Sequence, residues 1–197
     1  MDDDRHATAW FDRLYDAAER NALAVPWASE TPCPELGALL EAGLTPGRAI
    51  VVGCGLGDDA AALTQAGWAT TAFDVSATAI TWARERFGEV VDWHVADLFD
   101  LPDEWIAAFD LVVEVRTVQS LPPALQARAM QAVASLVRSR LLLVANLRPH
   151  RAIPTGPPWP LSLEELGTYE DAGLEEESIK TEGSGPGARV VATYVRS

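Results

Sequence analysis

Three glycines at alternating positions, Gly53, Gly55 and Gly57, form the pattern in this chain that is best suited to binding a ligand. Because glycine has no Cβ atom, it adopts positive φ angles and lets a ligand approach the backbone closely. Two aspartates, Asp74 and Asp97, stand where later apolar segments end. Their carboxylates can accept hydrogen bonds from ribose hydroxyls or from the exocyclic amine of adenine. The combination predicts a site for a nucleoside-containing ligand.

The residue after the last glycine distinguishes this turn from a dinucleotide-binding turn. That fingerprint, Gly-x-Gly-x-x-Gly, would place its final glycine at Asp58. A pyrophosphate needs open N–H groups and no negative neighbours at the helix N-terminus. We expect Asp58 or Asp59 to cap the following helix and to repel an anion there. The turn therefore favours a ligand without phosphate.

The segment Gly53-Cys-Gly-Leu-Gly57 resembles the first motif of the class I S-adenosylmethionine-dependent methyltransferases. The segment Val95-Ala-Asp-Leu98 resembles the third motif of that family, and Phe109-Asp-Leu-Val112 resembles its fourth-strand pattern. The resemblance covers roughly residues 48–197 and is similar to small-molecule enzymes of the thiopurine or tellurite type. It implies S-adenosyl-L-methionine as cofactor, with contacts from Gly53, Cys54, Gly55, Gly57, Asp74, Val75, Asp97, Leu98 and Glu114.

The elements that must position these residues alternate between strand and helix. The short apolar run Ala49–Val52 is typical of a strand that is covered on both faces. Alternation of this kind predicts an α/β, doubly wound sheet with helices on both faces. The resemblance implies a Rossmann-like sheet of seven strands in the order 3-2-1-4-5-7-6, with the last strand antiparallel. We expect one methyltransferase domain over residues 1–197, with a helical lid at 1–47 and a catalytic core at 48–197.

The second half of the chain has three further signals. The apolar face of Ala124–Val137 predicts a helix, followed by a turn at Arg138–Arg140 and a fifth strand over Arg140–Ala145. The segment Ser162-Leu-Glu-Glu165 is a capping box and predicts a helix start. The glycine-rich segment Gly183–Gly187 predicts a terminal hairpin.

Candidate catalytic residues depend on the acceptor. Glu114 is expected at the carboxyl end of a central strand, where open α/β sheets bind ligands. If the acceptor is an amine or a hydroxyl, Glu114, Tyr15 or His150 could remove its proton. A sulfur or halide acceptor needs no base. The candidate substrate contacts are Trp27, Gln119 and Trp159.

These residues predict methyl transfer from S-adenosylmethionine to a sulfur, nitrogen, oxygen, halide or metalloid atom of a small molecule. In-line displacement needs mainly alignment, which contributes on the order of 7–11 kcal/mol. One alternative is an NAD-dependent oxidoreductase or epimerase, which Asp58 disfavours. Another is a non-catalytic protein that binds S-adenosylmethionine.

Composition limits the partners. The net charge of -14 repels phosphate backbones and anionic membranes, so we expect neither nucleic acid nor membrane as a partner. Cys33 and Cys54 stand outside any disulfide or metal pattern, which predicts free thiols and no metal site. No apolar run approaches the length of a membrane span, and the first residues do not resemble a signal peptide. We expect a cytoplasmic monomer or homodimer.

Overall fold

The computed structural model describes residues 11–18, 20–22, 25, 30–149, 152, 154 and 156–197. Its strands are β1 (Arg48–Val52), β2 (Ala69–Asp74), β3 (Asp92–Val95), β4 (Phe109–Val115), β5 (Val137–Asn146), β6 (Glu175–Glu182) and β7 (Arg189–Val195). They follow the order β3-β2-β1-β4-β5-β7-β6, and β7 is antiparallel to both of its neighbours. The predicted sheet is therefore confirmed.

The chain divides into two compact units, Met1–Asp100 and Leu101–Ser197. The first contains β1 to β3 and the second contains β4 to β7. The division into a lid at 1–47 and a core at 48–197 within one domain stays a prediction. A membrane-crossing helix is absent from the described part of the chain, since none of its helices has the necessary length and apolar character.

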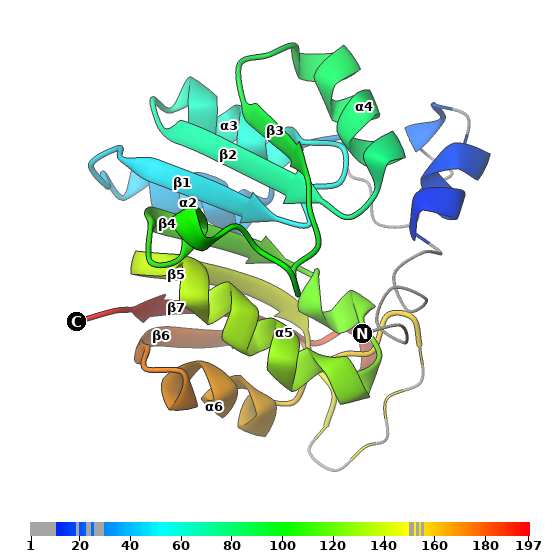
Figure 1. Cartoon of the computed structure of the whole chain (residues 1–197). Helices are drawn as coiled ribbons and strands as arrows, with labels where there is room; N and C mark the ends of the chain where they lie inside the picture. The colour runs from blue at the N-terminus through cyan, green and yellow to red at the C-terminus, as the bar shows by residue number, and fades with distance from the viewer. Residues whose placement is uncertain are drawn as a thin grey trace. The chain divides into compact units, whose positions relative to one another are not determined.

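Parallel strands organise the first unit. Strand β2 pairs with both β1 and β3 in parallel. The helices are α2 (Pro34–Glu41), α3 (Asp58–Gln65) and α4 (Ala77–Phe87), with α3 against β1 and β2 and α4 against β2 and β3 (Figure 1). The apolar residues of β1 are buried, as a strand covered on both faces requires. This pairing brings the carboxyl ends of the three strands to one edge.

A helix over residues 11–17 packs against α4 in the same unit. The packed cluster consists of Tyr15, Ala18, Ala22, Val25, Leu56, Ala79 and Trp82. Asp12 attaches this helix to the start of α4, because its carboxylate accepts hydrogen bonds from the Ser76 hydroxyl at 2.6 Å and the Thr78 N–H at 3.1 Å. Both bonds lower the pKa of Asp12. The helix over residues 11–17 is therefore part of the first unit and is packed on α4.

The second unit mixes parallel and antiparallel pairs. Strand β5 pairs with β4 in parallel, and β7 runs antiparallel to β5 and to β6. Helices α5 (Pro123–Leu136) and α6 (Leu163–Asp171) lie side by side (Figure 1). The predicted capping box is confirmed, since the Ser162 side chain accepts the Glu165 N–H and the Glu165 carboxylate accepts the Ser162 N–H. Short 3-10 helices are η2 (Asp103–Trp105), η3 (Val118–Ser120) and η4 (Gly185–Gly187).

The predicted turn at residues 138–140 is wrong. Strand β5 begins at Val137, directly after α5 ends. Backbone pairing with β4 extends the strand over these residues, since Val137 lies opposite Phe109 and Arg140 lies opposite Leu111. The charged side chains form ion pairs, Arg138 with Asp110 and Arg140 with Glu177. Charged side chains at a strand start therefore do not indicate a turn here.

Candidate functional site

The turn after β1 requires glycine for two different reasons. Gly53, Gly55 and Gly57 have φ angles of 60°, 52° and 88°, a region that residues with a Cβ atom adopt only under strain. Space is a second restriction, since a Cβ atom at Gly57 would lie 2.5 Å from the Trp93 ring. The glycines thus permit both the backbone path and close packing between the turn and Trp93.

The Asp74 carboxylate lies directly beside this turn. One of its oxygens accepts the Gly55 N–H at 3.0 Å, and the other accepts the Ser76 N–H at 2.9 Å. Burial raises the pKa of Asp74, and these hydrogen bonds act in the opposite direction. A carboxylate has about four acceptor positions, so Asp74 keeps capacity for further donors such as ribose hydroxyls.

Asp58 has a different role from the one predicted. The N-cap of α3 is Gly57, and it has no side-chain hydrogen bond, so the predicted cap by Asp58 or Asp59 is wrong. Asp58 instead forms two hydrogen bonds of 2.8 Å with Arg86, which also donates to the Leu56 carbonyl at 2.7 Å. Asp59 accepts the N–H of Cys33 at 2.6 Å.

Sequence reasoning missed Arg86. It lies on α4, 28 residues from Asp58, and no local pattern links the two positions. The pair places a positive charge against the carboxylate and fixes the carbonyl of Leu56. Arg86 therefore holds the glycine turn and neutralises the acidic residue next to it.

Tyr15 lies over the same turn. Its side chain is 2% exposed, and its hydroxyl is 3.0 Å from the position that a Cβ atom on Gly55 would occupy. The residue thus covers the glycine turn from the N-terminal helix. A catalytic role for Tyr15 stays a prediction.

The remaining candidates of the first unit follow β2 and β3. The Asp97 carboxylate accepts the Phe99 N–H at 2.9 Å, which fixes the turn after β3. Leu98 is buried and Val75 is half-buried. Cys54 is a free thiol, as is Cys33, which confirms the prediction. Burial raises the pKa of both thiols, so both stay protonated at neutral pH.

Glu114 belongs to the second unit and is fully buried. Its Oε1 accepts the N–H groups of Thr117 at 2.5 Å and Val118 at 3.0 Å. Its Oε2 is buried without a hydrogen-bond partner among the described residues. Burial raises the pKa of Glu114 to about 7. The side chain thus fixes the turn after β4, and its roles as a base or cofactor contact stay predictions.

Gln119 and Trp159 are connected through backbone groups. The Gln119 side-chain oxygen accepts the Asn146 N–H at 2.5 Å, and its carbonyl accepts the Trp159 N–H at 2.7 Å. Gln126 donates to the Trp159 carbonyl at 2.9 Å. Both glutamines therefore hold the segment that contains Trp159. Substrate contacts by Gln119 and Trp159 stay predictions, and Trp27 and His150 lie outside the described residues.

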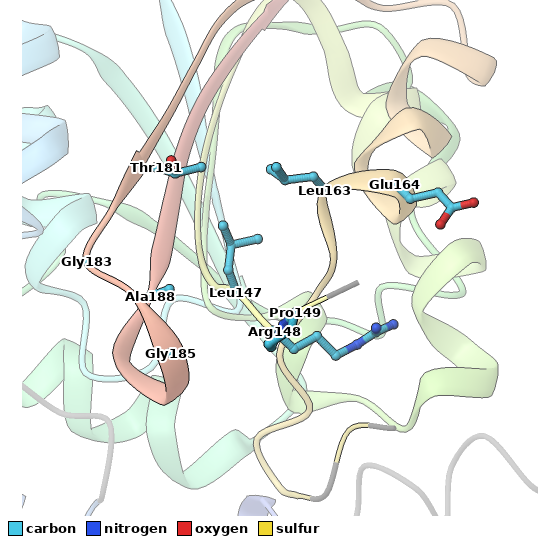
Figure 2. Close-up of a pocket in the computed structure, with 9 residues that line it drawn as sticks. All are labelled: Leu147, Arg148, Pro149, Leu163, Glu164, Thr181, Gly183, Gly185 and Ala188. Atoms are coloured by element: carbon cyan, nitrogen blue, oxygen red, sulfur yellow. The ribbon is translucent and has the colours of Figure 1, made fainter. Parts of the chain in front are cut away.

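A hollow of about 320 Å³ lies in the second unit, near the end of the β6–β7 hairpin. Figure 2 shows Leu163 and Thr181 pointing toward one another across it, whereas Arg148 and Glu164 point away. Its lining residues are Leu147, Arg148, Pro149, Leu163, Glu164, Thr181, Gly183, Gly185 and Ala188. None of the predicted site residues that the structure describes belongs to this lining.

Known proteins resemble this chain in sequence and in fold. A family model described as "Methyltransferase domain" matches residues 49–140. Together with the matches below, it supports a class I S-adenosylmethionine-dependent methyltransferase. The methyltransferase is 28% identical over 151 residues to an Arabidopsis thaliana protein named probable thiol methyltransferase 2. That match covers 73% of this chain and 66% of the relative, slightly less than two thirds of its length.

Solved structures share the fold of this methyltransferase. One was solved in work on the conversion of a disulfide bond into a thioacetal group during echinomycin biosynthesis. It is 25% identical, with a TM-score of 0.71, and the match covers 87% of this chain and 85% of that chain. Another is the Burkholderia thailandensis 1,6-didemethyltoxoflavin-N1-methyltransferase with its bound acceptor and S-adenosylhomocysteine, with 19% identity, a TM-score of 0.69 and coverage of 94% and 90%. The cofactor of the methyltransferase family is S-adenosylmethionine.

Proposed function

We propose that this methyltransferase transfers the methyl group of S-adenosylmethionine to a heteroatom of a small molecule, and that this atom is sulfur. The observation that carries the donor side is the buried Asp74 carboxylate beside Gly55. Two similar proteins favour sulfur, because one is named a thiol methyltransferase and the other is described by chemistry at a disulfide. A cytoplasmic location, a single domain and a monomeric or homodimeric state are further proposals.

The first unit has the groups that a nucleoside with a sulfonium side chain requires. Asp74 accepts hydrogen bonds from the ribose hydroxyls, and Asp97 accepts one from the adenine amine, with Leu98 and Val75 against the ring. The turn at 53–57, including Cys54, holds the methionine part through backbone groups. Since Arg86 neutralises Asp58, the turn keeps its shape without an uncompensated charge.

The reaction then needs little further help from side chains. When bound, the cofactor would supply an electrophilic methyl group to the acceptor sulfur, and the electron pair of the broken carbon–sulfur bond would stay on S-adenosylhomocysteine. A thiol has a pKa near 8.5, so a useful fraction is thiolate at neutral pH and its proton goes to water. The buried Glu114 fits this scheme, because we propose that it holds the turn rather than removing a proton.

The test uses purified protein with S-adenosylmethionine and a panel of thiols, amines, phenols and iodide. We expect methyl thioether and S-adenosylhomocysteine to form in equal amounts with one or more thiols, measured by mass spectrometry. Calorimetry with S-adenosylhomocysteine is the companion measurement. Absence of binding would refute the donor assignment, whereas binding without turnover of any acceptor would favour a non-catalytic binding protein. Turnover only of amines or phenols would refute the assignment of sulfur.

A further inference from the structure

Arg116 has an unusual backbone conformation at the end of β4. Its φ angle is 62°, in the left-handed region that a non-glycine residue seldom adopts. Its N–H donates to the Val144 carbonyl at 2.8 Å, and its own carbonyl accepts the Ser120 hydroxyl at 2.8 Å. Both backbone groups of the residue are therefore fixed.

The next two residues are fixed by a buried carboxylate. Glu114 accepts the N–H groups of Thr117 and Val118 and has no exposed surface. A turn held at four backbone groups cannot relax the strained φ angle. The exposed side chain of Arg116 thus extends from a rigid backbone. Less backbone entropy is therefore lost when the side chain binds a partner.

The charge of Arg116 is also unusual for this chain. With 29 acidic and 15 basic residues, carboxylates are abundant, yet its guanidinium has no ion pair or hydrogen bond in the described part of the chain. Other arginines of the second unit do have partners. Carboxylates pair with Arg138, Arg140, Arg148 and Arg189, and backbone carbonyls accept from Arg196.

The position suits a ligand contact. Arg116 follows the carboxyl end of a parallel strand, which is where open α/β sheets bind ligands. A guanidinium binds a carboxylate through two parallel hydrogen bonds, which fixes the orientation of the bound molecule. We infer that Arg116 binds a carboxylate of the methyl acceptor, so that the acceptor is a small thiol that carries a carboxylate. This inference rests on the proposed function.

The test compares thiols that differ only in the carboxylate. The pairs are 4-mercaptobenzoate with thiophenol, and 3-mercaptopropionate with 1-propanethiol. In Arg116→Gln, we expect the preference for the carboxylate-bearing member, as a ratio of kcat/KM values, to fall by about 10–100-fold, mainly through KM. Arg116→Lys restores part of the preference. Arg138→Gln removes the same charge from a position paired with Asp110 and leaves the preference unchanged.

A binding measurement keeps this inference separate from the proposed function. Protein saturated with S-adenosylhomocysteine is titrated with 4-mercaptobenzoate and 3-mercaptopropionate and observed by NMR, with no turnover required. We expect binding to the wild type and a matching loss in Arg116→Gln. Equal affinity of the two proteins, or no binding of either carboxylate to the wild type, overturns the inference. Failed methylation together with Arg116-dependent binding would refute only the proposed function.

Discussion

Two turns, each following a parallel strand, solve the same backbone problem in different ways. The turn after β1 reaches positive φ angles with Gly53, Gly55 and Gly57, whereas the turn after β4 does so with Arg116. Glycine removes the side chain and clears space for close packing. Arginine keeps a long charged side chain at the expense of backbone strain. The difference teaches that the first turn is built for close approach and the second for presenting a side chain.

A buried carboxylate supports each turn. Asp74 is 7% exposed and accepts the Gly55 N–H, while Glu114 is 0% exposed and accepts those of Thr117 and Val118. Asp74 therefore retains a small exposed surface, whereas Glu114 retains none. Glu114 holds its own turn, so substitutions at the two carboxylates should have different consequences.

Gly57→Ala should break the packing of the first turn. The added Cβ atom would lie 2.5 Å from the Trp93 ring, and the alanine would have to adopt a φ angle of 88°. We expect the free energy of unfolding to fall by about 2–4 kcal/mol, from overpacking and backbone strain together. Urea denaturation of the wild type and of Gly57→Ala measures this loss of free energy of unfolding.

Gly43→Ala is the matched control for this substitution. Gly43 has a φ angle of 84° but no atom within 4 Å of an added Cβ, so only strain remains. We expect a loss of about 1 kcal/mol. Equal losses at Gly43 and Gly57 would show that the contact with Trp93 is unimportant.

Stability should depend on pH through Glu114. Its pKa is raised from 4.5 to about 7, so between these values the folded state keeps a proton that the unfolded state has released. The contribution of Glu114 to the free energy of unfolding is therefore highest below pH 4.5. It falls by about 3 kcal/mol as the pH rises to 7 and then stays constant. Denaturation of wild type and Glu114→Gln from pH 5 to 8 isolates the effect. Parallel pH profiles would contradict it.

The pair of Asp58 and Arg86 should stabilise the first turn. Arg86→Leu leaves the Asp58 carboxylate and the Leu56 carbonyl without their hydrogen-bond donor. The Asp58 side chain is only 14% exposed, so water replaces this donor poorly. We expect a loss of about 2 kcal/mol. Adding Asp58→Asn should then cost little more, because the charge that lost its partner is gone. Fully additive losses in the double variant would argue against the pair.

Arg116→Gly should give the smallest effect, and in the opposite direction. Glycine adopts a φ angle of 62° without strain, so we expect a gain of about 0.5–1 kcal/mol after the entropy of the unfolded chain is included. Arg116→Ala keeps the strain and should not show this gain. A rise in melting temperature for glycine alone would separate strain from loss of the charge.

The sequence was sufficient for the fold. Glycines at alternating positions, aspartates at strand ends and the capping box at Ser162 are local patterns, and each reports its own backbone conformation. The turn predicted at residues 138–140 failed because the strand pairing there, of Arg140 with Leu111 and Val195, is a contact between distant segments.

The same limit applies to the site. Arg86 pairs with Asp58 across 28 residues, and Glu114 is buried by neighbours that no local pattern identifies. The positive φ angle of Arg116 was also unpredictable, because tertiary hydrogen bonds impose it on a residue that does not favour it. Motifs could therefore identify candidate donor-binding residues, whose roles stay predictions, whereas the contacts of Arg86 and the burial of Glu114 could not be predicted.

The most direct test of the account is calorimetric binding of S-adenosylhomocysteine to wild type, Asp74→Ala and Arg116→Gln. If the first turn holds the donor and the second selects the acceptor, Asp74→Ala weakens binding by roughly 10–100-fold through lost hydrogen bonds to a charged acceptor. Arg116→Gln binds S-adenosylhomocysteine with the affinity of the wild type. Unchanged affinity in Asp74→Ala, or an equal loss in both variants, would contradict this division of roles.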